Sequence, residues 1–370
     1  MLLFDAHLDL AWNALSWNRD LTKPVAESRE VEKGMTDHPG RGQGTVALPE
    51  MRRGGVAVCL STLLCRANLK AQKLTGHVRR DLDCATQQHA CAHARGQLGY
   101  YRLLEEMGEA TIIKTSQQLD QHWRRWEQGG GGGGDDRAKS KTPLGFIIAM
   151  EGADPIVSPA QAQRWFNEGL RTVGIAHYGA SAYGVGTGSS GPLTPMGVEL
   201  MKELNRVGMI LDLTHSSDPT FFQALDTFHG PVHASHNNVR KLVPGDRQYS
   251  DEQIRLLVQR NAVIGAVCDS WQLVPNYKRG EKPREAVTLN NVADTIDHIC
   301  QLAGNTNHVG IGSDLDGGFG TEQSPLEIDT ITDLQKLGPI LSSRGYSQGD
   351  VEKILHGNWL RFFRENLPKE

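Results

Sequence analysis

The chain has 370 residues, of which 38% are hydrophobic and 22% charged, and its formal net charge is −4. This composition is typical of a globular protein, and the negative charge excludes a broad positive field for nucleic acid or anionic lipid. We therefore expect neither a nucleic-acid nor a membrane partner.

The first residues argue against a signal peptide. The stretch MLLFDAHLDL places Asp5 and His7 inside what would have to be an apolar core, and no basic stretch precedes it. No other segment approaches the roughly eighteen uninterrupted apolar residues that a membrane helix needs. We expect a soluble protein of the cytoplasm.

Eight apolar, β-branched runs of strand length recur along the chain, each followed by enough residues to contain a helix. This rhythm predicts parallel βα repeats, and eight parallel strands close into a (β/α)8 barrel of the TIM type. The expected strands cover residues 2–8, 56–64, 144–151, 170–177, 209–215, 231–236, 262–268 and 308–314.

The clearest helix between these strands is expected from Pro195 to Val207. Thr194 suits its N-cap, Pro195 its first position and Gly208 the residue just past its end. A second helix is expected over residues 251–260, after Ser250.

The second crossover contains six consecutive glycines, Gly129 to Gly134, followed by the polar run DDRAKSK. Such a stretch cannot pack, which predicts a mobile loop. A linker between two domains is the alternative, but the same alternation of strands and helices resumes beyond it. We therefore expect one (β/α)8 domain over residues 1–370, with a glycine-rich surface insertion around 127–142.

Polar side chains concentrate where the expected strands end, which is where a barrel of this kind places its active site. The first strand ends in DAHLD, and alternation puts His7 and Asp9 on one face. A single histidine at a strand end is more often structural than a metal ligand, but here five further strands end in a histidine or an acid. These residues are Glu151, His177, His215, His236 and Asp314.

This set of side chains predicts a metal site. Imidazole nitrogens and carboxylate oxygens bind Zn²⁺ and similar divalent ions well, and four histidines with three carboxylates exceed what one tetrahedral ion can use. Two metal ions fit better, with one carboxylate bridging them and a shared water becoming a hydroxide nucleophile near neutral pH. Glu151, from a strand between the two histidine groups, is the expected bridge.

Other histidines and the cysteines are interpreted as structural. His89 and His93 have the spacing of a helical metal pair, but HACAH lacks the glutamate of a zincin helix, so a solvated helix face is expected. His233 should point away from His236, toward the surrounding helices, and His308 opens the last strand at its far end. The six cysteines form no CxxC pair and are expected to be reduced.

At these residues the sequence resembles the membrane (renal) dipeptidase family, peptidase family M19 of the amidohydrolase superfamily. The matching stretches span nearly the whole chain and read DAHLDLAW, MEGAD, TPMGVELMKELNRVGMILDLTHSS, ASHNNVRKLVPGDR, HVGIGSDLDG and HGNWLRFF. Their order and spacing are highly specific, whereas DxHxD alone would indicate only the wider superfamily. The resemblance implies a dipeptidase that uses two Zn²⁺ per subunit, acts on small dipeptides and forms a homodimer.

The resemblance also implies a role for each candidate residue. One zinc would be bound by His7 and Asp9 and the other by His215 and His236, with Glu151 bridging both. His177 would meet the substrate carbonyl or the developing oxyanion, and Asp314 would manage the proton of the nucleophile and contact the substrate. Arg247 would hold the terminal carboxylate of the substrate, which suits a bidentate guanidinium. Without the family, a surface salt bridge would be the preferred interpretation of Arg247.

The sequence departs from better-known family members around the expected pocket. Asn237 and Asn238 follow His236 where small hydroxyl residues are common, and Cys268 and Asp269 stand where tyrosine and asparagine would be expected. We expect these positions in the pocket walls, so the preferred dipeptide and the acceptance of D-residues stay open.

Two alternatives to a dipeptidase also stay open. The first is another amidohydrolase reaction, such as opening a cyclic amide, although many such relatives use a carboxylated lysine where this chain has His177. The second is a barrel that binds a ligand without turning it over. The full set of expected metal ligands together with Asp314 argues against this second alternative.

Overall fold

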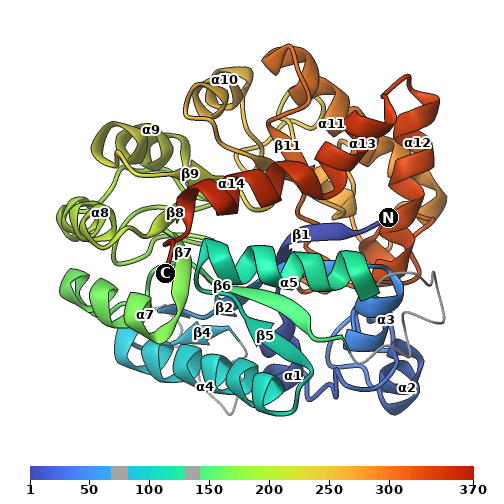
Figure 1. Cartoon of the computed structure of the whole chain (residues 1–370), viewed down its shortest axis with the longest axis horizontal. Helices are drawn as coiled ribbons and strands as arrows, with labels where there is room; N and C mark the ends of the chain where they lie inside the picture. The colour runs from blue at the N-terminus through green and yellow to red at the C-terminus, as the bar shows by residue number, and fades with distance from the viewer. Residues whose placement is uncertain (68–81, 130–141) are drawn as a thin grey trace.

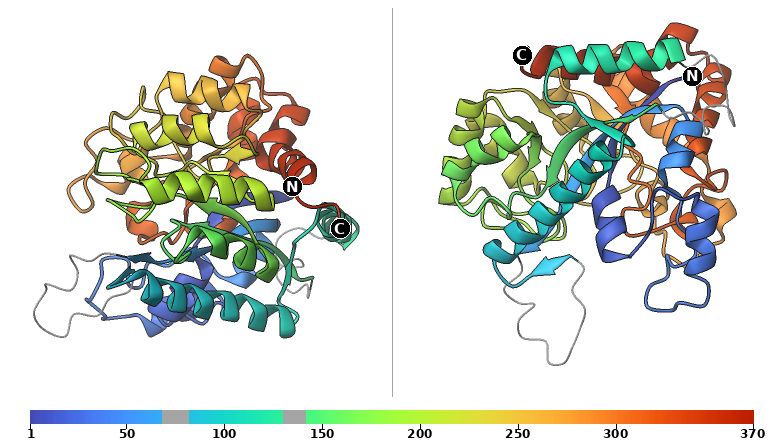
Figure 2. Two further views of the ribbon diagram at one scale, coloured as in Figure 1. Left: turned by 90° about the vertical axis from the view of Figure 1, so that its left-hand side faces the viewer. Right: turned by 60° about the horizontal axis from the view of Figure 1, so that its bottom comes forward.

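The structure is a computed structural model that describes residues 1–67, 82–129 and 142–370. Most of the glycine-rich insertion predicted around 127–142 therefore lies outside the described residues. The rest of the chain forms a barrel of strands with an outer layer of helices (Figures 1 and 2).

All eight predicted strands are present, several of them shorter than the apolar runs that predicted them. Their bounds are Leu3–Leu8 (β1), Val56–Leu64 (β2), Leu144–Glu151 (β6), Leu170–Gly174 (β7), Ile210–Asp212 (β8), Val232–His233 (β9), Ile264–Ala266 (β10) and Val309–Ile311 (β11). They pair in parallel in the order β10-β11-β1-β2-β6-β7-β8-β9. A parallel bridge between Ala234 and Ile264 joins the two ends of this order, which confirms a nearly closed (β/α)8 barrel.

Three short strands were not predicted. β5 (Ala110–Ile112) pairs in parallel with the beginning of β6. β3 (Arg66–Ala67) and β4 (Asp83–Cys84) form a separate two-stranded sheet. Runs of two or three residues carry no readable periodicity, so their pairing partners had to be found in three dimensions.

The helices surround the barrel. Their bounds are Leu10–Ser16 (α1), Val25–Val31 (α2), Leu48–Arg53 (α3), Gln87–Glu106 (α4), Ser116–Gly129 (α5), Ala162–Glu168 (α7), Pro195–Val207 (α8), Asp218–Thr227 (α9), Asp251–Gln259 (α10), Leu289–Ala303 (α11), Leu337–Ser343 (α12), Gln348–Glu352 (α13) and Asn358–Asn366 (α14). Among the described residues, none of the helices combines the length and the apolar character needed to span a membrane.

The helix predicted from Pro195 to Val207 is confirmed as α8, with both of its predicted ends. The Thr194 hydroxyl accepts a hydrogen bond from the Gly197 amide at 3.0 Å. Gly208 follows the helix with φ of 75°, a left-handed conformation that glycine adopts without steric cost. The second predicted helix, α10, ends one residue earlier than expected, at Gln259.

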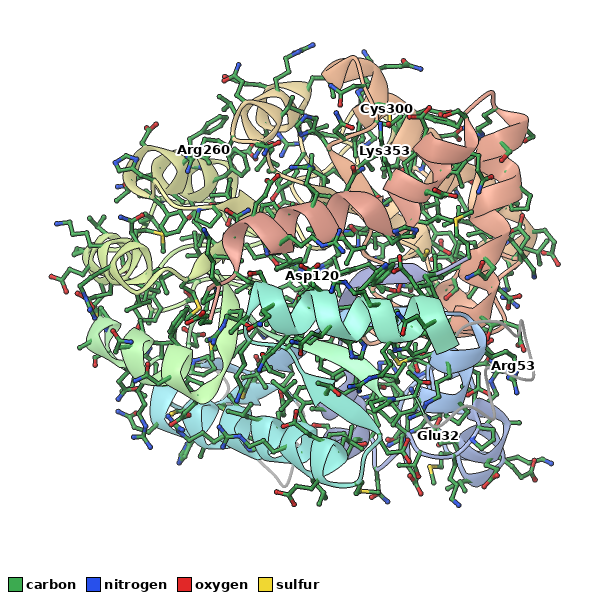
Figure 3. All side chains as sticks on the ribbon, viewed as in Figure 1. Glu32, Arg53, Asp120, Arg260, Cys300 and Lys353 are labelled. Atoms are coloured by element: carbon green, nitrogen blue, oxygen red, sulfur yellow. The ribbon has the colours of Figure 1, made fainter. Side chains whose placement is uncertain are left out.

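Helices α5 and α14 lie side by side across the amino ends of the strands (Figure 1). Asp120 of α5, labelled in Figure 3, accepts a hydrogen bond from Arg364 Nε of α14 at 2.6 Å. Phe363 of α14 stacks on Phe4 of β1, with ring centroids 5.5 Å apart. The amino end of the barrel is thus covered, and the carboxyl ends of the strands are left for a functional site.

Candidate active site

The carboxyl ends of the strands bring the predicted site residues together. A cavity of about 200 Å³ opens there, and its walls include Glu151, Arg247 and six further residues that the sequence singled out. Those six are Asp9, His177, His215, His236, Asp269 and Asp314. His7 lies just beneath, with its ring 3.7 Å from the ring of His236 between centroids.

Glu151 lies at the centre of this cluster. Its Oε1 is 3.2 Å from His215 Nε2, 3.3 Å from His236 Nε2 and 3.7 Å from His177 Nε2. Its Oε2 is 3.5 Å from His7 Nε2. One carboxylate therefore reaches all four histidines, which is the arrangement that a bridging ligand requires.

A second set of contacts joins His7 to the remaining carboxylates. His7 Nε2 lies 3.7 Å from Asp9 Oδ2 and 3.7 Å from Asp314 Oδ1. Three triads bring one ligand atom from each member within 4.8 Å of the others. They are His7, Glu151 and His236; Glu151, His177 and His215; and His7, Asp9 and Asp314.

The electrostatics of the cluster favour a bound cation. Burial raises the pKa of Asp314 well above its ordinary value and also raises that of Glu151. Burial opposes charge on His7 too, yet the nearby carboxylates of Glu151 and Asp9 hold the pKa of its imidazole well above the usual range. Buried carboxylates are costly unless a positive charge accompanies them, and divalent cations would supply it.

Hydrogen bonds at the far ring nitrogens orient two of the histidines. Thr187 Oγ1 lies 3.0 Å from His215 Nδ1, and Ser235 Oγ lies 2.9 Å from His236 Nδ1. Both contacts leave Nε2 facing Glu151. His7 Nε2 is buried without a hydrogen-bond partner among the described residues. A metal ion needs imidazoles that are held in one orientation and that turn a ring nitrogen toward the ion. The residues present therefore fit a metal ion.

The backbone near the first and last strands is held by Asp5 and Asn13. Asp5 Oδ1 accepts hydrogen bonds from the amides of His7, at 3.2 Å, and Ser313, at 2.9 Å. Asn13 Nδ2 donates to the carbonyls of Asp9, at 3.0 Å, and Asp316, at 2.9 Å. The Asp9 end of β1 is therefore tied to the turn that carries Asp314.

Two of the candidate residues have left-handed backbone. The φ of His215 is 64° and that of Asp314 is 58°. Such conformations cost free energy for residues other than glycine and cluster at functional sites.

Arg247 is buried, with 2% of its surface exposed, which excludes the surface salt bridge considered from the sequence. Its Nη1 donates to Asn237 Oδ1 at 2.6 Å and its Nη2 to the carbonyl of His236 at 2.9 Å. Its Nε has no hydrogen-bond partner among the described residues. The guanidinium is thus fixed in the cavity wall with donors left for an anion.

His177 and Tyr178 also line the cavity. Burial and the nearby guanidinium of Arg66 lower the pKa of His177 well below its ordinary value, so its imidazole is neutral. The ring of Tyr178 lies 4.8 Å from that of His177 and 5.0 Å from that of His215, between centroids. Sequence reasoning missed Tyr178 and Arg66. Arg66 could have been noticed, because it follows the end of a predicted strand by two residues.

The departures from the family pattern have different positions. Asp269 lines the cavity, as expected for a pocket wall. Asn237 contributes through its hydrogen bond to Arg247. Asn238 and Cys268 are not among the residues that line it, and Asn238 Oδ1 instead accepts a hydrogen bond from the Val267 amide at 3.0 Å. The expectation of a pocket wall was therefore wrong for these last two.

The histidines interpreted as structural lie away from the cluster. His89 and His93 are exposed on α4. His233 is buried under α14, where its Nε2 lies 2.6 Å from Thr172 Oγ1 and its ring contacts Trp359. All six cysteines are free thiols, and Cys65 and Cys84 approach each other to 2.9 Å between sulfur atoms.

Comparison with known sequences gives one family match. The profile of the membrane dipeptidase family, peptidase family M19, matches residues 134–369. Dipeptidase tcpJ of Claviceps purpurea is 31% identical over 227 residues, which are 59% of this chain and 50% of that protein. Dipeptidase verJ of Clonostachys rogersoniana is 30% identical over 223 residues, covering 59% and 54%. The alignments thus span about half the length of these curated relatives.

Two solved structures have the same fold. A dipeptidase described as a metallo peptidase of family M19 has a TM-score of 0.75 at 22% identity, covering 100% of this chain and 99% of that one. A metallo peptidase from Rhodobacter sphaeroides, liganded with a phosphinate mimic of the dipeptide L-Ala-D-Ala, has a TM-score of 0.75 at 22% identity and 99% coverage of both chains.

Proposed function

The chain belongs to the membrane dipeptidase family, peptidase family M19, and on this premise we propose that it is a metal-dependent dipeptidase. The observation that carries the proposal is the convergence of four histidines and three carboxylates around Glu151, beside a buried arginine with unspent donors. A small cavity that closes on one side with a guanidinium suits a short peptide with a free carboxylate.

We assign two zinc ions to the cluster. His7 and Asp9 would hold one ion, His215 and His236 the other, and Glu151 both. Bound there, the ions would polarise the scissile carbonyl and make water a stronger nucleophile at neutral pH. His177 also approaches Glu151, but its Nε2 is farther from that carboxylate, at 3.7 Å, than the Nε2 atoms of the three histidines assigned as ligands. The neutral state of its imidazole supports a different role, as a hydrogen-bond donor to the carbonyl oxygen of the substrate.

The remaining residues orient the substrate and move a proton. Arg247 binds the C-terminal carboxylate, because its guanidinium is already held by Asn237 and the His236 carbonyl and loses little freedom on binding. Asp314 takes the proton that the attacking water loses and returns it to the leaving nitrogen. The peptide C–N bond breaks, and the products are two amino acids.

The test combines metal analysis with a panel of dipeptides. The purified chain loaded with zinc is expected to hold two equivalents and to hydrolyse L,L dipeptides such as Ala-Ala. The panel includes L-Ala-D-Ala, which would show whether a D-residue is accepted at the C-terminal position. Chain that holds two equivalents and cleaves no member of the panel would refute the proposal.

Asp314→Asn separates chemistry from metal binding. This substitution is expected to abolish turnover while the metal content stays at two equivalents, since Asp314 is assigned to the proton and not to the ions. An unchanged rate would remove Asp314 from the mechanism. The homodimer and the cytoplasmic location expected from the sequence stay predictions, which sedimentation and cell fractionation would test.

A further inference from the structure

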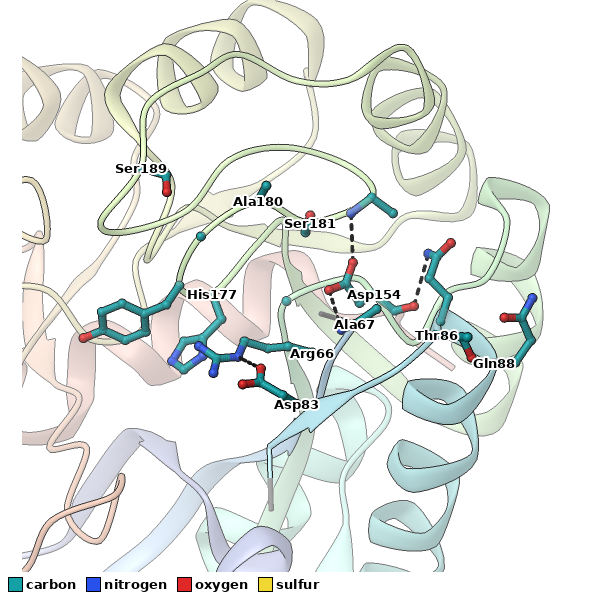
Figure 4. Close-up of a pocket in the computed structure, with 15 residues that line it drawn as sticks. Arg66, Ala67, Asp83, Thr86, Gln88, Asp154, His177, Ala180, Ser181 and Ser189 are labelled. Atoms are coloured by element: carbon teal, nitrogen blue, oxygen red, sulfur yellow. Dashed lines mark hydrogen bonds and ion pairs between the residues drawn. The ribbon is translucent and has the colours of Figure 1, made fainter. Parts of the chain in front are cut away.

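A second, larger cavity of about 760 Å³ lies next to the cluster (Figure 4). It is lined by the β3–β4 pair, the beginning of α4, the turn after Glu151 and the loop that follows His177. The two cavities share three residues, Arg66, His177 and Tyr178, whereas Arg247 lines only the smaller one. A substrate whose carboxylate is at Arg247 and whose scissile carbonyl is at the cluster therefore extends its N-terminal residue toward the larger cavity.

Arg66 is the cation at the junction of the two cavities. Its Nε donates to Asp83 Oδ1 at 2.8 Å, and this is the one hydrogen bond of its side chain among the described residues. Neither of its Nη groups has a hydrogen-bond partner in the part of the chain that the structure describes, and 20% of its side chain is exposed. Figure 4 shows the guanidinium beside His177, with Asp83 on its other side. A carboxylate of the substrate can accept hydrogen bonds from the two Nη groups while Asp83 still accepts from Nε.

The backbone that carries Arg66 is held in place. Arg66 and Asp83 are direct neighbours in the register of β3 and β4. The amide of Ala67 donates to Asp154 Oδ2 at 2.8 Å, and the amide of Ala182 donates to Asp154 Oδ1 at 3.0 Å. Asp154 therefore uses both oxygens on the backbone and does not compete for the Arg66 guanidinium.

Among the residues that line the larger cavity, Arg66 is the one with a permanent positive charge. Apart from Tyr178, the residues that line the larger cavity are small or polar, among them Thr86, Gln88, Ser181 and Ser189. An acidic side chain that enters the cavity therefore has one cation to bind, Arg66.

We propose that Arg66 binds the side-chain carboxylate of an acidic N-terminal residue, so that the preferred substrates are dipeptides that begin with glutamate or aspartate. This inference rests on the proposed dipeptidase function and adds the substrate class. Arg66 acts as a specificity residue, through binding of a side chain that does not take part in the chemistry.

The test compares two isosteric substrates, Glu-Ala and Gln-Ala, on the same enzyme. Wild-type chain loaded with zinc is expected to show kcat/KM about tenfold or more higher for Glu-Ala, mainly through KM. Arg66→Gln is expected to bring the ratio of the two kcat/KM values to about one. Because both substrates are measured on one preparation, partial misfolding or general loss of activity cancels in the ratio.

Asp83→Asn supplies a change in the opposite direction. It removes the carboxylate that competes for the Arg66 guanidinium and keeps the shape of the side chain, so the Glu-Ala preference is expected to rise severalfold. A merely structural role of the pair would not raise the ratio. Arg102→Gln is the control, since Arg102 lies exposed on α4 and donates to the carbonyl of Glu168 at 3.1 Å, away from the cavity.

The outcomes separate the two proposals. A wild-type ratio near one, or an Arg66→Gln ratio equal to that of wild type, would overturn the role of Arg66 while cleavage of Ala-Ala still supported a dipeptidase. Failure to cleave Ala-Ala, Glu-Ala and Gln-Ala alike would refute the dipeptidase function itself. The wild-type ratio decides the matter even if Arg66→Gln does not fold.

Discussion

Replacing Asn13 by alanine is expected to lower the stability of the protein and to loosen the backbone of the assigned metal ligand Asp9. The Asn13 side chain makes three buried hydrogen bonds: it donates to the carbonyls of Asp9 and Asp316 and accepts from Arg19 Nη1 at 2.9 Å. Each contributes about 1 kcal/mol net, so the free energy of unfolding should fall by about 3 kcal/mol. The loss stays below the full cost of leaving a buried carbonyl without a hydrogen bond, because the backbone amide of residue 13 still donates to the Asp9 carbonyl.

The assay is urea unfolding of metal-free protein, followed by zinc titration. We expect the affinity for zinc to fall by about tenfold to a hundredfold, because the backbone of the assigned ligand Asp9 loses its tie to the turn of Asp314. Asn205→Ala, on the exposed face of α8, is the control and should change stability by less than about 0.5 kcal/mol. If Asn13→Ala unfolds like wild type and binds zinc as tightly, the positioning argument is wrong.

Three further predictions concern metal, packing and pH. A chelator should abolish dipeptide turnover and lower the Tm, and added zinc should restore both, because ions that bind only the folded chain stabilise it. Gly312→Ala should lower the free energy of unfolding by about 3 kcal/mol or more, since a Cβ at Gly312 would lie 1.8 Å from the Ser235 carbonyl oxygen. Gly96→Ala is the control: Gly96 lies in α4 with open space around it, so this substitution should raise the free energy of unfolding by about 0.5 kcal/mol. Thermal or urea unfolding measures both. Burial lowers the pKa of His122 to about 4. As the pH falls, the unfolded chain therefore protonates His122 at a higher pH than the folded chain does. The free energy of unfolding should be constant above about pH 6.5 with respect to this group and should fall by about 3 kcal/mol as the pH drops to 4. Unfolding of His122→Gln should be less sensitive to pH over this range, and an identical pH profile would contradict the assignment.

The barrel was predictable because its signals are local. Each long strand is an apolar run of its own, and the ends of α8 follow from Thr194 and Gly208 alone. The polar residues that end parallel strands must meet at one mouth, so the cluster around Glu151 could be predicted without knowing any distance. Chain order and residue type were sufficient for these features.

What could not be predicted depends on neighbours that are distant in sequence. Thr187 orients His215 although the two residues are 28 positions apart in the sequence, and no sequence motif predicts their contact. Arg66 meets Asp83 through strands of two residues, too short for a periodic pattern. Whether Cys268 faces the cavity or the barrel wall depends on the register at the end of a strand, where regular alternation stops.

The left-handed backbone at Asp314 limits which replacements test chemistry alone. Asparagine and aspartate tolerate this conformation better than other side chains, and a β-branched residue would add roughly 1–2 kcal/mol of strain. Asp314→Asn, which exchanges one carboxylate oxygen for an NH₂ group, is thus the substitution that removes the acid with the least effect on stability. Among inactive variants from random mutagenesis at codon 314, asparagine and glycine should accordingly be the most stable, and a library sorted by solubility would be enriched in both.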